Sequence, residues 1–236
     1  MKYMGSKDRI AKDILPIILK DRSPDQWYIE PFCGGCNIID KVQGNRIAND
    51  SNMYLIEMWK ALLNGWQPIE ISKEQYTDIK NNSDKYPLYL IGWTAFNCSY
   101  SGKWFGGYAG TVNTKVGTIR NYQREAINNI NKQLPKLKNI IFQNDNYRNI
   151  EIPDNSIIYC DPPYSDTTKY FDKFDSEKFW EWVRTITNKG HKVFISEYKA
   201  PKDFECIWEK EIKSSLSANG KIGGNKISVE KLFKLK

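Results

Sequence analysis

Short runs of apolar residues alternate along the chain with segments in which apolar residues recur every three or four positions. Helical spacing is found at 52–64, 121–134 and 176–188, and a further helix is expected over 6–21. The apolar runs have the length and composition of buried strands, and they lie at 27–30, 46–48, 140–142, 157–160 and 193–195. Strands that alternate with helices predict an α/β protein with a mostly parallel, Rossmann-like sheet and helices on both of its faces.

The stretch from 55 to 135 interrupts this alternation. Residues 73–98 have helical spacing with a break near Pro87, and residues 99–120 are rich in Gly, Ser, Thr and Asn, which predicts a long loop or hairpin. We therefore expect a small, mainly helical insertion at 55–135 within a main domain formed by 1–54 and 136–236. From about residue 204 the tail predicts two or more strands, joined by turns at Asn219-Gly220 and Gly223-Gly224.

A glycine turn follows the first predicted strand, in the sequence Glu30-Pro31-Phe32-Cys33-Gly34-Gly35-Cys36. Such a turn lets the backbone approach a ligand at the carboxyl edge of a parallel sheet. Asp50 follows the next strand, at the position where nucleoside-binding folds use an acid to hold ribose hydroxyls. The turn lacks the GxGxxG glycines that bind a pyrophosphate, which argues against a nicotinamide dehydrogenase. A tight turn beside a surface Asp is the alternative.

A second motif, Asp161-Pro162-Pro163-Tyr164, follows the apolar run at 157–160. The two prolines fix φ and remove two backbone donors, so carbonyls near them can act as acceptors for a ligand. A carboxylate beside a rigid carbonyl suits an amine with two N–H groups to donate, and Tyr164 offers a flat face for stacking on a base. A Pro-Pro turn with a helix-capping Asp is the alternative.

The formal net charge is +7, and most of the excess lies between residues 97 and 138, where seven basic residues face a single acid, Glu125. A basic surface attracts nucleic acid. Lys103, Arg120 and Arg124 are candidate contacts, with Trp104 as a stacking residue. The alternatives are a solvated helix face for the arginines and packing inside the insertion for the aromatic residue.

The cysteine content predicts neither a metal site nor disulfide bonds. The chain has five cysteines and one histidine, and the pair Cys33 and Cys36 lacks the second pair of ligands that a structural zinc requires. His191, which opens a strand, is expected to be structural. No apolar run is long enough to span a bilayer, and the N-terminus is too polar for a secretory signal. We therefore expect a cytoplasmic protein without a membrane partner.

Three segments together resemble the Dam-type, class alpha, adenine-specific DNA methyltransferases: the tetrapeptide at 161–164, the glycine turn at 30–34, and the N-terminal Lys2-Tyr3-Met4-Gly5-Ser6-Lys7. The order also matches, with the cofactor turn first, a target-recognition insertion next and the catalytic tetrapeptide last. The resemblance implies an enzyme that transfers a methyl group from S-adenosylmethionine, without a metal, to the N6 amine of an adenine flipped out of double-stranded DNA. It also implies a monomer in the cytoplasm of a bacterial or phage-infected cell.

The resemblance assigns roles to individual residues. It implies that the target base is held by the catalytic residues Asp161, Pro162, Pro163 and Tyr164. It implies that the cofactor is bound by Tyr3, Gly5, Lys7, Glu30, Phe32, Gly34, Asp50 and Asp145. The expected DNA-binding residues of the insertion are Lys103, Trp104, Arg120 and Arg124. The sequence departs from the family at Cys36, where glycine is usual, and at Asn146, where an apolar residue is usual.

Two other functions use the same scaffold. One is methylation of a different amine, such as cytosine N4 or a base in RNA, and Asp as the first residue of the tetrapeptide favours adenine over these. The other is a DNA-binding protein that keeps the fold with impaired catalysis, for instance through Cys36.

Overall fold

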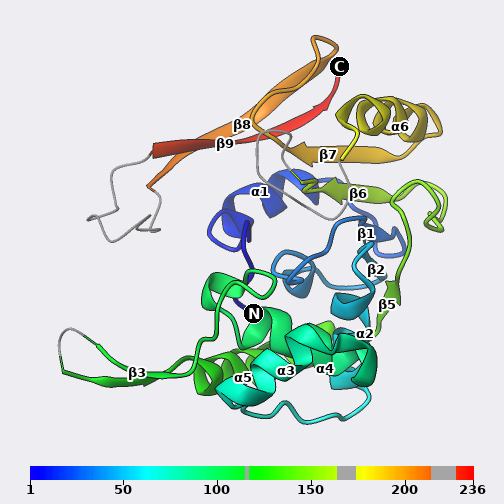
Figure 1. Cartoon of the computed structure of the whole chain (residues 1–236). Helices are drawn as coiled ribbons and strands as arrows, with labels where there is room; N and C mark the ends of the chain where they lie inside the picture. The colour runs from blue at the N-terminus through cyan, green and yellow to red at the C-terminus, as the bar shows by residue number, and fades with distance from the viewer. Residues whose placement is uncertain (115–116, 164–173, 214–226) are drawn as a thin grey trace. The chain divides into compact units, whose positions relative to one another are not determined.

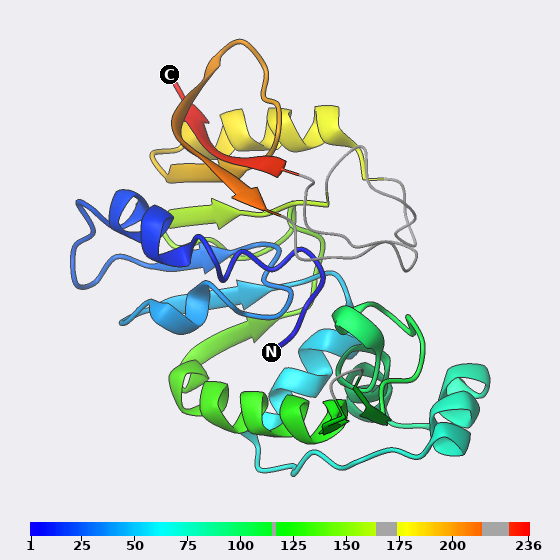
Figure 2. The same ribbon diagram turned by 90° about the vertical axis from the view of Figure 1, so that its left-hand side faces the viewer.

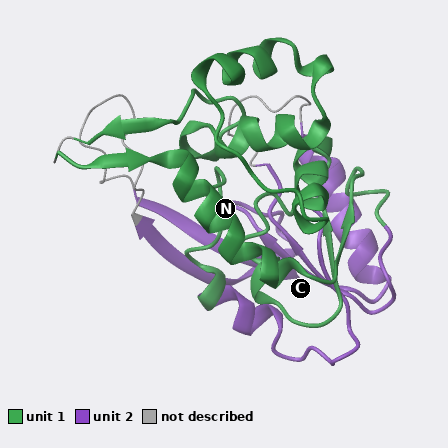
Figure 3. Cartoon of the chain, turned by 90° about the horizontal axis from the view of Figure 1, so that it is seen from below, with its two compact units in different colours: residues 1–12, 32–150 green, residues 13–31, 151–236 purple. Residues whose placement is uncertain are grey.

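The structure is a computed structural model that describes residues 1–114, 117–163, 174–213 and 227–236 (Figure 1). The chain forms two compact units (Figure 3). Unit 1 consists of residues 1–12 and 32–150, and unit 2 of residues 13–31 and 151–236. Unit 1 contains the whole of the predicted insertion, and unit 2 contains the strand that leads to Asp161.

Unit 2 contributes five neighbouring strands of the main sheet, in the order β1-β6-β7-β9-β8. Strands β1, β6 and β7 are parallel to one another, whereas β9 runs antiparallel to both β7 and β8. All residues of β6 are buried, as expected of a parallel strand that is covered on both faces. The strands comprise Tyr28–Glu30 (β1), Ile157–Cys160 (β6), Lys192–Ser196 (β7), Phe204–Lys213 (β8) and Ile227–Leu235 (β9).

The long helix of unit 2, α6 (Ser176–Asn188), lies beside β7 (Figure 1, Figure 2). Its first turn is capped by Asp175, whose side chain accepts the Lys178 N–H at 3.1 Å. Its buried stripe includes Phe179, Val183 and Ile186, at the three- and four-residue spacing of an amphipathic helix. The apolar pattern of the sequence therefore fixes which face of α6 packs inward.

Unit 1 combines a parallel strand pair with a group of helices. Strand β2 (Arg46–Asn49) pairs with β5 (Ile140–Gln143), and the hairpin β3 (Thr111–Asn113) and β4 (Ile119–Asn121) extends away from the helices of this unit (Figure 1). The α-helices are α2 (Met53–Leu63), α3 (Lys73–Asn81), α4 (Leu88–Gly92) and α5 (Tyr122–Gln133). A π-helical turn, η3 (Trp93–Asn97), continues α4, and short 3₁₀ turns lie at η1 (Ile39–Lys41), η2 (Ser83–Lys85), η4 (Tyr100–Gly102) and η5 (Leu134–Leu137).

The predicted α/β class with a mainly parallel sheet is confirmed. The helix predicted over 6–21 was wrong at both ends, because α1 comprises only Ala11–Ile18. Gly5 has a φ of 83°, and the N–H groups of Ser6 and Ile10 bond to carbonyls three residues earlier, which makes tight turns instead of helix. The predicted turns near 219–224 lie outside the described residues.

The contact between α2 and α4 depends on a glycine. A Cβ atom added to Gly92 would lie 2.1 Å from the backbone oxygen of Tyr54, so the two helices approach more closely than any side chain allows. Trp93, which follows directly, is fully buried and donates its indole N–H to the Ile69 carbonyl at 2.8 Å.

We predict that Gly92→Ala lowers the free energy of unfolding by about 1–3 kcal/mol, because the helices must separate to admit the methyl group. Chemical denaturation measures the effect. Leu88→Ala on the same helix is the control, since Leu88 is 40% exposed and its truncation should cost less. Equal stability of Gly92→Ala and the wild type would contradict the close approach.

Candidate functional site

The part of the glycine turn from Phe32 to Cys36 belongs to unit 1, and its conformation is fixed by backbone hydrogen bonds. The N–H of Cys33 donates to the carbonyl of Asn49 at 2.8 Å, and the N–H of Cys36 donates to the carbonyl of Cys33 at 2.7 Å. Gly34 and Cys36 both have positive φ, 46° and 54°. A left-handed backbone costs a residue with a side chain about 1 kcal/mol, so Cys36 adopts a conformation that glycine would take more readily.

Asp50 ties the turn to the start of α2. One carboxylate oxygen accepts the N–H of Gly34 and the other accepts the N–H of Asn52, each at 3.0 Å. Burial raises the pKa of Asp50, and these two hydrogen bonds act in the opposite direction. Each oxygen keeps acceptor capacity for a further donor, such as a hydroxyl group.

Asp145, which follows β5, is held beside the end of β2 by Asn49. The Asn49 amide donates to the Asp145 carbonyl and accepts the Asp145 N–H, each at 3.0 Å, and Asn49 is fully buried. The Asp145 carboxylate is exposed and accepts the N–H of Asn146 at 2.6 Å. Asn49 was not among the predicted site residues, although a polar residue that ends a buried strand was a usable signal.

The N-terminal segment lies directly on the glycine turn. A Cβ atom added to Gly34 would lie 2.6 Å from the Tyr3 ring, and one added to Gly35 would lie 2.7 Å from the Tyr3 Cβ. Both glycines are therefore required by the close approach of Tyr3. Lys7 is buried and donates to the Gly5 carbonyl at 3.3 Å, which shapes the same segment. Phe32, at the start of the turn, packs on Tyr147 with ring centroids 5.2 Å apart.

Two further side chains, which were not among the predicted site residues, hold the turn. The indole N–H of Trp59 donates to the Gly34 carbonyl at 3.3 Å, and the amide of Gln133 donates to the carbonyls of Gly35 and Cys36 at 3.0 and 3.1 Å. Gln133 lies on the buried stripe of α5 with Gln123, Ala126 and Ile130. A glutamine at the apolar positions of a helix was the available signal.

In unit 2, Glu30 and Asp161 lie at the carboxyl edge of the parallel strands. Ile29 pairs with Ile158 and Cys160 pairs with Ile195, so Glu30, Asp161 and Ser196 emerge at the same edge of the sheet. Glu30 is buried and accepts the Tyr28 hydroxyl at 2.9 Å. Asp161 and Pro163 are half-buried and Pro162 is buried, whereas Tyr164 lies outside the described residues.

Three side chains that precede Glu30 and Asp161 on their strands have raised pKa values and stay protonated. Burial, followed by the charge of Asp161, raises the pKa values of Tyr159 and Cys160 well above their usual range. Burial and then Glu30 do the same to the pKa of Tyr28. A thiol whose pKa is raised is a poor nucleophile. Cys160 is fully buried and belongs to the core.

The candidate DNA contacts have different surroundings in unit 1. Arg120 forms a bidentate pair with Glu125, at 2.5 and 2.9 Å, and lowers the pKa of Glu125 to about 2. Arg124 pairs with Glu70 at 2.7 Å. Lys103 is exposed, and no ion pair of its side chain occurs within the described part of the chain.

Trp104 takes part in an aromatic cluster of unit 1. Its ring centroid lies 5.2 Å from that of Tyr54, 5.2 Å from that of Phe96 and 5.1 Å from that of Phe105. Trp104 therefore packs partly inside the insertion, which was the alternative to a stacking role. His191 is buried, and its Nδ1 accepts the N–H of Ser156 at 3.1 Å, as expected of a structural histidine.

Two negative findings hold for residues 1–114, 117–163, 174–213 and 227–236. They contain no group of three or more His, Cys, Asp or Glu side chains placed to hold a metal ion. They also contain no helix that is long and apolar enough to cross a membrane.

Fold and site thus define an α/β protein with a buried glycine turn in one unit and an Asp-Pro-Pro strand end in the other. The chain belongs to the D12 class N6 adenine-specific DNA methyltransferase family, whose sequence pattern matches residues 3–214. This membership confirms the resemblance inferred from the three sequence segments.

Two curated relatives match most of the chain. It is 26% identical over 214 residues to the modification methylase StsI of Streptococcus sanguinis, and 24% identical over 216 residues to the type II methyltransferase M.FokI of Planomicrobium okeanokoites. These matches cover 80% and 79% of this chain but only 32% of each relative, so the chain spans about a third of their length.

Among solved structures, the tRNA (m1A58) methyltransferase TrmI of Aquifex aeolicus aligns with 95% of this chain and 69% of its own. The sequence identity is 11% and the TM-score is 0.40.

Proposed function

We propose that this chain transfers a methyl group from S-adenosylmethionine to the N6 amine of adenine in double-stranded DNA. The observation that carries the proposal is membership of the D12 family over residues 3–214, combined with an Asp-Pro-Pro sequence at the carboxyl end of a buried parallel strand. The names of the two relatives further support a role in modification within a restriction–modification system. We further propose that the protein is a monomer and is located in the cytoplasm.

Asp161 and the Pro162 carbonyl are the proposed acceptors for the two hydrogens of the target amine. The exocyclic nitrogen of adenine is a poor nucleophile because its lone pair is delocalised into the ring. Acceptors for both N–H bonds favour a tetrahedral nitrogen whose lone pair points at the methyl donor, and positioning of this kind supplies much of a rate enhancement. Pro163 fixes the backbone that follows. Tyr164, outside the described residues, is proposed to stack on the base.

The residues of the glycine turn fit S-adenosylmethionine. When bound, this cofactor supplies an electrophilic methyl group on a sulfonium. Gly34 and Gly35 leave no room for a Cβ beside Tyr3, and Asp50 offers half-buried carboxylate oxygens that suit ribose hydroxyls. Asp145 is the proposed acceptor for the amine of the cofactor's adenine. The remaining proposed cofactor contacts are Tyr3, Gly5, Lys7, Glu30 and Phe32.

We propose that residues 55–135 are the target-recognition insertion within a catalytic domain formed by 1–54 and 136–236. An adenine inside a duplex is out of reach, so the base must be extruded at a cost of a few kcal/mol. Lys103, Arg120 and Arg124 are the proposed phosphate contacts, and Trp104 is proposed to support the protein–DNA interface.

We predict that Asp161→Ala lowers kcat for methylation of duplex DNA at least about a hundredfold, because the target amine loses a charged acceptor. Transfer of labelled methyl groups measures the effect. Asp154→Ala is the control, since Asp154 is exposed and precedes the same strand. Full activity of Asp161→Ala at unchanged melting temperature would refute the assignment.

We predict that Asp50→Asn weakens binding of S-adenosylmethionine about tenfold and leaves DNA affinity unchanged. The neutral amide loses the charge that strengthens hydrogen bonds to hydroxyl donors. Titration calorimetry measures the cofactor, and a gel-shift titration measures DNA. Asp78→Asn, at an exposed acid of the same unit, is the control. An unaltered cofactor affinity would remove Asp50 from the site.

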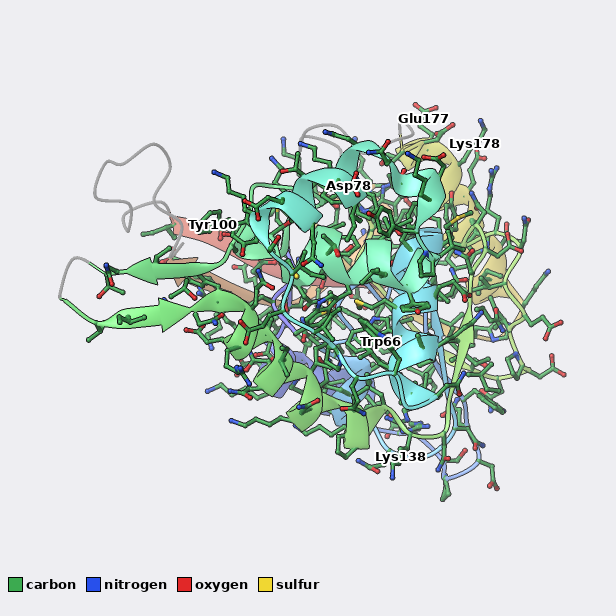
Figure 4. All side chains as sticks on the ribbon, turned by 60° about the horizontal axis from the view of Figure 1, so that its bottom comes forward. Trp66, Asp78, Tyr100, Lys138, Glu177 and Lys178 are labelled. Carbon is green, nitrogen blue, oxygen red and sulfur yellow. The ribbon has the colours of Figure 1, made fainter. Side chains whose placement is uncertain are left out.

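We predict that Lys103→Ala reduces the slope of log Kd for DNA against log salt concentration by about 1, because one phosphate contact is lost. Fluorescence anisotropy over a salt series measures the slope. Lys138→Ala is the control, since Lys138 is also exposed and lies well away from Tyr100, which is near Lys103 in sequence (Figure 4). Equal slopes for wild type and Lys103→Ala would place the DNA surface elsewhere.

A further inference from the structure

Three consecutive carbonyls of the glycine turn are held by buried side chains from two helices of unit 1. Trp59 on α2 bonds to the Gly34 carbonyl, and Gln133 at the end of α5 bonds to those of Gly35 and Cys36. Trp59 is fully buried and Gln133 is 4% exposed. The turn is therefore fixed by one residue within α2 and by the last residue of α5.

We propose that Gln133 is a positioning residue that sets the affinity for S-adenosylmethionine by fixing the peptide units of Gly35 and Cys36. This inference rests on the proposed function. A peptide unit rotates as a plane, so holding its carbonyl oxygen also fixes the direction of the N–H that follows. Because Gly34 and Cys36 occupy the left-handed region, the peptides between them have alternative conformations that these hydrogen bonds exclude.

Glutamine is specifically suited to this position. Its amide nitrogen carries two N–H groups, one for each carbonyl, whereas an ionised carboxylate of the same shape has none. Removing the donor leaves two buried carbonyls without it, and unsatisfied buried acceptors are costly. We expect the turn to change its conformation so that these carbonyls find other donors. Such a change alters the surface that the turn presents to a ligand.

The same helix supplies a matched control. Gln123 is 2% exposed and also bonds to backbone, since its amide donates to the Ile71 carbonyl at 2.9 Å and accepts the Ile71 N–H at 2.6 Å. Replacement of Gln123 by glutamate removes a buried donor as replacement of Gln133 does. It leaves the glycine turn untouched, because Ile71 precedes α3.

The experiment compares Gln133→Glu with Gln123→Glu in the full chain. We expect Gln133→Glu to raise KM and Kd for S-adenosylmethionine about tenfold with a smaller effect on kcat, whereas Gln123→Glu lowers the melting temperature and leaves KM unchanged. The Met1 amino group donates to the side-chain oxygen of Gln133, so a carboxylate at this position keeps that partner and loses only the donor to the turn.

Trp59→Phe provides an independent variant should Gln133→Glu not fold. It removes the indole donor to Gly34 and keeps an aromatic ring, and we expect KM for the cofactor to rise several-fold. An equal KM increase in the Gln123 control, or unchanged KM in Gln133→Glu and Trp59→Phe, overturns the inference. Failure of the wild type to bind S-adenosylmethionine overturns the proposed function and this inference together.

Discussion

The candidate cofactor site depends on satisfying the backbone of one buried glycine turn. A turn that brings main chain close to a ligand also takes its carbonyls out of water, and each carbonyl then needs a donor from the protein. In unit 1 these donors are Trp59 and Gln133, while Asp50 accepts the N–H of Gly34. The shape of the turn therefore depends on the packed helices as much as on the glycines.

The geometry of parallel strands explains why acids that are widely separated in the sequence lie close together in each unit. The carboxyl ends of neighbouring parallel strands lie at one edge of the sheet. In unit 2 this rule brings Glu30 and Asp161 to the same edge, and in unit 1 it places Asp50 and Asp145 after the paired strands β2 and β5. Asp50 and Asp161 follow their strands directly, Asp145 follows β5 by two residues, and Glu30 is the last residue of β1, so no long loop has to be ordered to position these acids.

Features that depend on local sequence could be predicted. Runs of Ile and Tyr before Asp161 predicted β6, and the apolar stripe at 176–188 predicted α6 with the bounds that the structure gives. The contacts of Asn49 and Gln133 could not be predicted, because they join segments about ninety residues apart or more. Glutamine at a buried helical position indicates that a partner exists, but only the packing of α5 shows that the partner is the turn.

Arg120 and Arg124, the two arginines of the insertion, are each paired with a glutamate. These ion pairs bear on the proposed binding of DNA. Exposed ion pairs contribute at most about 1 kcal/mol, so a phosphate can replace Glu125 as the partner of Arg120. Glu125 also bonds to Lys2 at 3.2 Å, and both cations lie near the ring of Tyr122. Exchange at Arg120 would therefore leave Glu125 with a cationic partner, so that neither charge becomes isolated. Because the pair is weak, Arg120 remains available to the polyanion that we propose it binds.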